Sequence, residues 1–461
     1  MNNRCAAKAL AGLVTLCAAL SVPPAAATSD FLADIVGNGS AGIGAALRLN
    51  QSLYRGEGLR VDVLPVYLYE GDYVYLHASR AGFKFAFDQD KRVDLFLSYR
   101  LEGYPIEDAP SSVAGMTRRG PETDAGVSYE QRFSWGRLFG EYLHDTSGDS
   151  FGGELRLGAS YERRRGRLIL IPYFMIAARD ATLNNYYYGV LPSEATPDRP
   201  AYEPGGGVNT TLGLNARYDL THNWHFLAGI SATRWANGVR RSPIVEDRLQ
   251  LSGYGGFAYE FDQSPPKPGW DRLPLIFKLL HGASSDCNLM KIMVLTCTGT
   301  HTSDDTSVSS IEIGRPFSEE PYGWPVSIVG VVGLLNHDEA GLQPDFWQLN
   351  VYLKAYYWGF PWSERVRTRI GFGAGLSYAQ RIPYSEAIDQ QRSGSNGTKL
   401  IQYLDPTVDI SVGDIFGWKG HRDTYIGLGV SHRSGVFRAA QLYDNVYGGS
   451  NYIYTYLEWR M

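Results

Sequence analysis

The sequence lacks an apolar run long enough to cross a bilayer as an α-helix. Beyond its first residues, the most apolar stretches are residues 168–178 and 326–335, and both are short and rich in β-forming side chains. A membrane-spanning helix needs roughly 20 apolar residues. A membrane location would therefore require a β-barrel, the other fold that satisfies its backbone hydrogen bonds in lipid.

Cysteine is scarce. Of the 4 cysteines, Cys5 and Cys17 lie in the first residues, which leaves Cys287 and Cys297. In an oxidising compartment this remaining pair predicts a disulfide. A zinc site would need further ligands, and His281 and His301 are too loosely spaced to provide them. We expect no metal and no cofactor.

Basic residues are not in excess. The chain has 43 lysines and arginines against 48 aspartates and glutamates, and its formal net charge is −5. A nucleic-acid partner would favour a basic patch, so this mild acidity argues against one.

The first 27 residues have the organisation of a secretory signal peptide. Arg4 and Lys8 form a basic start, residues 9–22 are almost wholly apolar, and two prolines then break the run. The apolar segment is too short for a spanning helix, and the alanines that follow are the small side chains that a signal peptidase requires. We expect residues 1–27 to be removed on export.

Most of the remaining chain alternates with a period of two. Ile370, Phe372 and Leu376 fall on one face of residues 369–378, while arginine, glycine and serine fall on the other. Segments of roughly 10 residues with one apolar and one small or polar face are typical of membrane-barrel strands. A soluble β-sandwich also alternates, but its strands usually have about 5–6 residues. The 31 tyrosines and 10 tryptophans fit the aromatic girdles of an outer-membrane barrel.

Two segments resemble the terminal strand of an outer-membrane protein. Residues 452–461 are amphipathic and aromatic-rich, although they end in Met461 where such proteins usually end in phenylalanine. An internal copy at residues 252–261 is followed at once by the proline-rich residues 264–269. We therefore predict a boundary near residue 264 and an all-β fold of two antiparallel transmembrane β-barrels in tandem. One larger barrel is the alternative.

The first predicted barrel, residues 28–263, resembles the MipA/OmpV family of outer-membrane proteins. The resemblance rests on YYGV at residues 187–190, AYEPGGG at 201–207, Trp224, RSPIV at 241–245 and YEF at 259–261. It implies an outer-membrane barrel of roughly 12 strands. Members of this family are described as scaffolds for a murein-hydrolase and synthase complex and as adhesion or stress-response proteins. No catalytic residues come with the resemblance.

The second half predicts a smaller barrel. Residues 264–305 are interpreted as a linker that holds the cysteine pair. Its apolar residues 273–280 and the cysteine-bracketed residues 287–297 could form an amphipathic helix and a first strand, or a periplasmic plug. Residues 306–461 form the second barrel. With residues 290–298 as an additional strand the total is roughly 8, an even number as expected for such barrels.

The strand predicted at residues 423–434 carries the one constellation with possible chemistry. Its even residues are apolar up to Val430 and should face lipid, and His432 and Ser434 continue that face. Because a barrel ends in the periplasm, this penultimate strand runs outward and brings both side chains near the outer leaflet. Asn451, at the start of the last strand, has the same parity and could lie beside them. An imidazole can take the proton of a hydroxyl for nucleophilic attack.

This pattern resembles the outer-membrane lipid A deacylases of the PagL type, which are eight-stranded barrels with a His-x-Ser pair on the outer wall. Gly435, after the serine, would help to form an oxyanion hole. The glutamate of that family is missing, so the candidates to orient the histidine are Asp444 in the intervening loop and Asn451. The alternative is an interfacial group in which Arg433 pairs with lipopolysaccharide phosphate.

The sequence thus predicts a protein of the Gram-negative outer membrane with three functional hypotheses. The first is a barrel protein of MipA/OmpV type with a scaffold, adhesion or envelope-maintenance role and peptidoglycan-remodelling proteins as partners. The second is a lipid A or phospholipid acyl-ester hydrolase whose second barrel acts on outer-membrane lipids or lipopolysaccharide. The third is a pore formed by one larger barrel.

Overall fold

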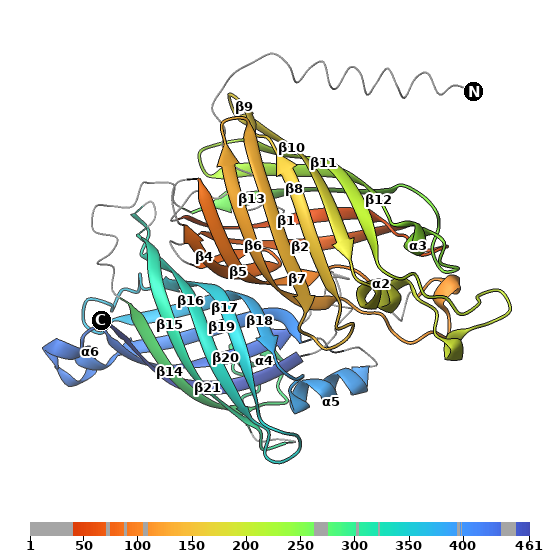
Figure 1. Ribbon diagram of the computed structural model, residues 1–461. Coiled ribbons are helices and arrows are strands. Elements are labelled where there is room, and N and C mark those ends of the chain that lie inside the picture. The colour runs from red at the N-terminus through yellow and green to blue at the C-terminus, as the bar shows by residue number, and fades with distance from the viewer. Residues whose placement is uncertain are drawn as a thin grey trace.

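The computed structural model folds the chain into two closed β-barrels (Figure 1). It describes residues 40–70, 74–86, 90–104, 109–261, 275–300, 304–320, 323–393, 397, 399–434 and 449–461. The predicted signal peptide and the proline-rich residues 264–269 lie outside the described residues. No helix in the described part of the chain is long and apolar enough to cross a membrane.

In the described residues, twelve strands close the first barrel, and a short thirteenth strand, β9, pairs only with β10. Neighbouring strands are antiparallel, and the ring is completed where β1 pairs with β13 and β10 pairs with β11. A short β9 extends the hairpin between β8 and β10. The strands are β1 (Ser40–Gln51), β2 (Leu59–Glu70), β3 (Val74–His77), β4 (Arg80–Ala86), β5 (Lys91–Arg100), β6 (Glu122–Phe133), β7 (Gly136–Asp145), β8 (Gly153–Ser160), β9 (Arg163–Arg165), β10 (Leu168–Arg179), β11 (Gly207–Asp219), β12 (Trp224–Arg234) and β13 (Gln250–Glu260).

The connections of this barrel are short at one end and long at the other. Residues 134–135 join β6 to β7 and residues 220–223 join β11 to β12, whereas residues 180–206 join β10 to β11 at the opposite end. Outer-membrane barrels have short periplasmic turns and longer extracellular loops. The long-loop end is therefore extracellular. Its helices are η2 (Ser111–Val113), α2 (Ala181–Tyr188), η3 (Pro192–Glu194) and α3 (Asn237–Arg240).

The second barrel has eight strands in the described residues, and β14 pairs with β21 to close it. Two separate closed barrels agree with the tandem prediction, and the alternative of one larger barrel is wrong because β1 already pairs with β13. The strands are β14 (Ile276–Ser284), β15 (Ser307–Glu319), β16 (Val326–Asp338), β17 (Phe346–Tyr357), β18 (Thr368–Ala379), β19 (Leu400–Ser411), β20 (Thr424–Ser434) and β21 (Gly449–Arg460). The helices are α4 (Leu289–Met293), α5 (Tyr384–Ser393), α6 (Val412–Phe416) and η6 (Lys419–His421).

The first strand of the second barrel does not lie where the sequence predicts it. The sequence predicts this strand at residues 290–298, but the strand is β14, part of the predicted segment forms α4, and the barrel begins well before residue 306. The inward positions Ile276 and Leu280 are buried and the outward Leu279 is exposed. Because both faces of β14 carry large apolar side chains, its alternation is hidden in the sequence.

Both faces of the strands follow the predicted alternation elsewhere. In β18, the outward side chains of Ile370 and Phe372 are 50% and 46% exposed. Arg369, the residue before them, is 3% exposed and points inward. Outward apolar side chains in this arrangement face lipid, and inward ones meet inside the barrel.

Ion pairs and tyrosines fill the interior of the second barrel. Lys278 and Lys354 both pair with Asp405, and further along the lumen Arg369 lies 2.7 Å from Glu458. The buried charged residues of this interior include Lys278, Glu312, Lys354, Arg369, Asp405, Asp409 and Glu458. Buried charges are tolerated when they are paired in this way. The lumen is therefore a packed polar core.

Helix α5 closes the extracellular end of the second barrel. Glu386 on this helix is fully buried and lies 3.0 Å from the Nε atom of Arg433 on β20. The same helix places the Ser385 hydroxyl 3.3 Å from the hydroxyl of Tyr452 on β21.

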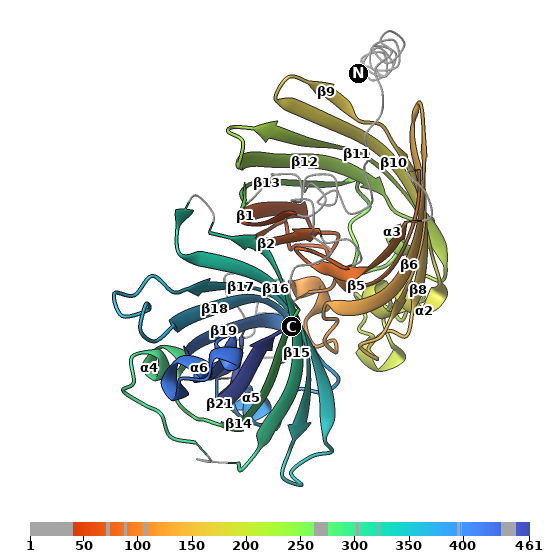
Figure 2. The same ribbon diagram turned by 90° about the vertical axis from the view of Figure 1, so that its left-hand side faces the viewer.

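The two barrels stand side by side, as both views show (Figure 2). The Gln402 side chain of the second barrel donates to the Tyr67 hydroxyl of the first, and the Tyr378 hydroxyl donates to the Thr146 carbonyl at 3.2 Å. We call this contact the seam. Its buried apolar residues are Tyr67, Leu76 and Tyr99 of the first barrel with Leu376, Leu400 and Ile401 of the second.

Candidate functional site

His432 and Asn451 meet on the outer wall of the second barrel. They are direct partners in the ladder between β20 and β21, and His432 Nδ1 lies 2.7 Å from Asn451 Oδ1. An amide oxygen only accepts, so Nδ1 carries the hydrogen and donates a hydrogen bond to Asn451 Oδ1. The Nε2 atom of the same ring then keeps a lone pair, as a general base requires.

Ser434 lies on the same face, two residues beyond the histidine, and is the last residue of β20. Its register partner is Gly449 on β21. Side chains two apart on a strand lie on one face, so the hydroxyl shares the outer face with the imidazole, and in the described residues the hydrogen-bond partner of the imidazole is Asn451. Gly435 and Asp444, the other sequence candidates, lie outside the described residues.

Arg433 does not face lipid, contrary to the alternative in which it would bind lipopolysaccharide phosphate. Its side chain is 1% exposed, points into the lumen, and donates from Nη1 to the Ser377 hydroxyl at 2.6 Å. The reason is the two-residue period of the strand, which sends Arg433 inward when its neighbours at 432 and 434 point outward.

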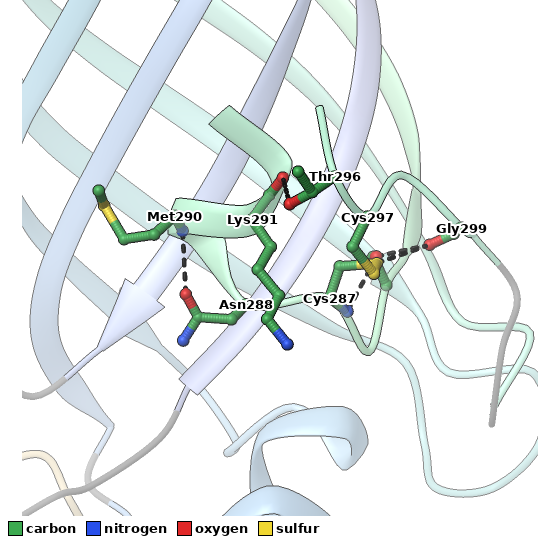
Figure 3. The surroundings of a disulfide bond; sticks show 8 residues. Cys287, Asn288, Met290, Lys291, Thr296, Cys297 and Gly299 are labelled. Carbon is green, nitrogen blue, oxygen red and sulfur yellow. Dashed lines mark hydrogen bonds between the residues drawn. A yellow bond between two sulfur atoms is a disulfide. The ribbon is translucent and has the colours of Figure 1, made fainter. Parts of the chain in front are cut away.

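A disulfide joins Cys287 to Cys297, whose Cα atoms are 5.6 Å apart, and closes a loop around α4 (Figure 3). The Asn288 side chain caps this helix by accepting a hydrogen bond from the Met290 backbone nitrogen at 2.9 Å. Asparagine is a favoured N-cap residue, so the sequence did carry a signal for a helix where a strand was predicted.

Helix α4 packs on the outer wall of the second barrel, against Val430, which lies two residues before His432 on β20. Leu289 and Ile292 are buried against Val430, and Leu404 and Ile453 complete the contact. Val430 is consequently 6% exposed although it has lipid-facing parity. The loop therefore covers the outer wall beside His432 and Asn451.

The free face of this loop is apolar. Met290, Val294 and Leu295 are 61%, 63% and 79% exposed. Exposed apolar side chains at the extracellular edge of a barrel are suited to the outer leaflet. The surroundings of His432 are thus lipid on one side and an ordered helix on the other. No group of three or more metal-binding side chains occurs in the part of the chain that is described.

Three of the five family motifs, at residues 187–190, 201–207 and 241–245, meet at the extracellular end of the first barrel, whereas Trp224 and residues 259–261 pair at its periplasmic end. The Ser242 hydroxyl donates to the Tyr188 carbonyl at 2.7 Å, and the Tyr202 hydroxyl donates to the Gly238 carbonyl at 2.8 Å. We call this layer the cap. Its buried residues are Leu53, Tyr54, Tyr104, Val113, Leu183, Tyr187, Tyr188, Val190, Val239, Ile244 and Val245. These three motifs thus build a structural lid of loops.

Residues 43–261 match the family model described as MltA-interacting protein MipA. The matched range covers the strands from β1 to β13, so the first barrel is a MipA family domain, as its motifs predict. The second barrel lies outside the match, and its likeness to PagL-type deacylases stays a prediction.

Three relatives are similar to this chain over its first half. Outer membrane protein Omp26La of Vibrio anguillarum is 28% identical over 212 residues, which are 45% of this chain and 76% of the relative. Outer membrane protein OmpV of Vibrio cholerae is 28% identical over 155 residues, or 34% of this chain and 60% of that relative. The MltA-interacting protein of Escherichia coli K12 is 24% identical over 237 residues, or 51% and 95%. Together with the barrels, these relatives assign the chain to the outer membrane of a Gram-negative bacterium.

Proposed function

We propose, starting from the MipA family domain of the first barrel, that this chain is an outer-membrane scaffold that holds a peptidoglycan-remodelling enzyme at its periplasmic face. The relative named MltA-interacting protein supports a partner of this class. The capped first barrel and the filled second barrel also favour a role in binding over a role in conduction.

The observation that supports this proposal most directly is an arginine-rich hairpin at the periplasmic end of the first barrel. Strand β9 extends the hairpin between β8 and β10 past the rest of the sheet, and it consists of Arg163, Arg164 and Arg165 (Figure 1). The Arg164 side chain is 58% exposed, and its nearest acid, Glu162, is 4.0 Å away. Guanidinium groups held weakly at a surface are available to the carboxylates of a partner. This arginine hairpin is the proposed docking element.

The experiment replaces Arg163, Arg164 and Arg165 together by alanine in the full chain. The variant and the wild type are reconstituted in nanodiscs, and binding of the MltA protein of the same bacterium is measured by biolayer interferometry. We expect about a tenfold or greater loss of affinity, because such contacts are each worth roughly 1 kcal/mol or less and act together.

A matched control uses Lys419 and Arg422, which lie at the periplasmic end of the second barrel. Their replacement by alanine should leave the affinity unchanged. Equal binding of the hairpin variant and the wild type would remove the proposed docking element, and no binding of MltA to the wild type would remove this partner.

A second candidate function rests on the contact between His432 and Asn451. We propose that the outer wall of the second barrel hydrolyses an acyl ester of an outer-membrane lipid. Ser434 Oγ would attack the ester carbonyl while Nε2 of His432 takes the hydroxyl proton, and that proton would leave with the alcohol. Water would then cleave the acyl-enzyme and release a fatty acid. Asn451 would orient the imidazole.

This second function is tested by the lipid A profile of cells that express the chain, read by mass spectrometry. The wild type should release ester-linked acyl chains, and His432→Ala and Ser434→Ala should each abolish the release. Arg433→Lys, a change inside the lumen, is the control because it leaves the outer wall untouched. Identical profiles for wild type and His432→Ala would rule the hydrolase out.

A further inference from the structure

The first barrel is hollow beneath its cap. Two adjoining cavities of about 300 Å³ and about 400 Å³ occupy its lumen, a size typical of small-ligand sites. They share the lining residues Arg48, Ser98, Leu101, Arg156, Met175 and Ser252. Neither the scaffold role nor the ester hydrolase uses this space.

The wall beside these cavities is interrupted. Strand β3 pairs with β2 only at Leu68, Tyr69 and Glu70, because the hairpin from β3 to β4 turns back at Ala78. Within the described residues, the edge of β2 from residue 59 to residue 66 therefore pairs with no strand on the side of β5. This leaves a gap in the strand pairing in the extracellular half of the barrel wall, which we call the window.

The window has defined borders. Its floor is the turn at Ala78 and Ser79, and its sides are β2 and the end of β5. At its top the Arg60 guanidinium donates to the Gly103 carbonyl at 2.9 Å and so bridges the two sides. Leu64, Ser79 and Leu101 on these borders also line the larger cavity. The lumen therefore reaches the barrel wall at the window.

The window lies at the seam between the barrels. Leu64 and Leu101 pack against the seam cluster, to which the second barrel contributes Leu376, Leu400 and Ile401. These second-barrel side chains give the outer side of the window an apolar surface. An alkyl chain that passes through the window would stay in contact with apolar side chains on both barrels.

The larger cavity combines apolar and cationic groups. Its described lining includes Arg48, Arg80 and Arg156 but no aspartate or glutamate. Asp62 lies 3.4 Å from Arg48, Glu141 lies 3.2 Å from Arg156, and Glu154, which lines the smaller cavity, lies 3.0 Å from Arg156. The arginines are more accessible than these acids, because the Arg48 and Arg156 side chains keep 21% and 24% exposure whereas Asp62, Glu141 and Glu154 keep 2%, 1% and 6%.

We propose that the first barrel binds a single-chain anionic amphiphile, which enters through the window by way of the seam between the barrels. Its anionic head lies against Arg48 and Arg156, and its alkyl chain contacts Leu64, Val66 and neighbouring apolar side chains of the lumen. Guanidinium groups form strong charge-assisted hydrogen bonds to carboxylate or phosphate. A fatty acid and an anionic lysophospholipid share this chemistry, and a neutral alkanol of equal length does not.

The test uses the full chain in nanodiscs and three photoreactive probes with a diazirine in the alkyl chain: a long-chain fatty acid, lysophosphatidylglycerol and the matching alkanol. Crosslinked peptides are identified by mass spectrometry. For the wild type we expect labels on inward residues such as Leu64 and Met175, with the preferred anion labelling at least about tenfold more than the alkanol. The ratio between the two anions decides whether a free fatty acid or a lipid headgroup is the source.

Two variants on one strand provide the matched comparison. Ser98→Trp fills the space shared by both cavities, whereas Leu95→Trp adds the same ring to the lipid-facing side of β5, where Leu95 is 48% exposed. We expect Ser98→Trp to lose the lumen label about tenfold or more and Leu95→Trp to keep it, with the heat-modified gel mobility of a folded barrel in both.

Labels confined to outward residues in the wild type would overturn the proposal, whatever the variants do. Equal labelling by the anions and the alkanol would equally overturn it, since the arginines would then have no part in binding. Loss of lumen labelling in Ser98→Trp with retention in Leu95→Trp supports it.

Discussion

Arg119 and Glu194 join two extracellular loops of the first barrel across 75 residues of sequence. The Arg119 Nη2 atom donates to both carboxylate oxygens of Glu194, at 3.0 and 2.9 Å. The same carboxylate accepts from the backbone nitrogens of Thr117 at 2.9 Å and Leu191 at 3.1 Å. One buried carboxylate thus ties the loop before β6 to η3 and holds the cap together.

Replacement of Glu194 by alanine should loosen the cap. Arg119 would remain buried without its carboxylate, and breaking a buried pair costs roughly 3–5 kcal/mol. We expect faster cleavage within residues 180–206 when intact cells are treated with protease, while the barrel keeps its folded gel mobility. Glu203→Ala is the control, because Glu203 is exposed in the same loop. Equal cleavage of the two variants would show that the pair does not hold the cap.

The cap should also loosen in acid. Burial raises the pKa of Glu194, but the hydrogen bonds from Thr117 and Leu191 and the charge of Arg119 outweigh it and hold that pKa below its ordinary value. A carboxyl with a depressed folded-state pKa stabilises the fold above its unfolded pKa, and this contribution is lost as pH falls through the folded pKa. Cleavage of the loop by an acid-active protease should therefore rise as pH falls from about 5 towards 3. Glu194→Gln should lack this pH dependence.

Much of the fold follows from the sequence because alternation determines which face each residue occupies. The two-residue alternation predicts the tandem barrels and the break after β13. It also predicts that His432 and Asn451 share one face. Alternation failed at β14, where Ile276 and Leu280 are apolar although they point inward. It also says nothing of loops, so Glu386 on α5, which holds Arg433, could not be found by this argument.

The candidate sites divide in the same way. The outward face of His432 and Ser434 is a local property of one strand and could be predicted. The cover of that face by α4 and the window between β2 and β5 depend on where separate segments meet in space. The window exists because β3 has only four residues. The turn at Ala78 ends β3, and no simple sequence signal predicts the positive φ of 46° at this alanine.

Removal of the disulfide should release α4 from the outer wall. Cys287→Ser with Cys297→Ser frees a short loop, and a disulfide typically contributes about 2–4 kcal/mol to the stability of what it closes. Trypsin should then cut after Lys291, which is exposed, several-fold faster than in the oxidised wild type. Reduction of the wild type should reproduce the effect. An unchanged cleavage rate would mean that the packing of Leu289 and Ile292 on Val430 suffices to hold the helix.

The ion pairs inside the second barrel should dominate its stability. Asp405→Asn removes the carboxylate that both Lys278 and Lys354 contact; Lys278 keeps its contact with Glu312 at 3.0 Å, whereas Lys354 is left facing an amide. The free energy of unfolding should fall by roughly 3–5 kcal/mol, measured by urea denaturation of the chain in lipid vesicles. Glu320→Gln, in an exposed periplasmic turn, should change it by less than about 0.5 kcal/mol. Similar values for the two variants would contradict the pairing as a source of stability.

The purified chain should not behave as an open pore in a planar bilayer. In the second barrel, Glu386 and Arg433 close the extracellular end above a lumen of paired charges. In the first barrel the cap covers the cavities, and the pair of Arg119 with Glu194 holds the cap in place. We therefore expect no stable conductance steps for the wild type and brief, flickering steps for Glu194→Ala, recorded under identical voltage. Stable steps in the wild type would show that one lumen is open despite these contacts, whereas silence in both proteins would mean that loosening the cap does not open a path through the first barrel.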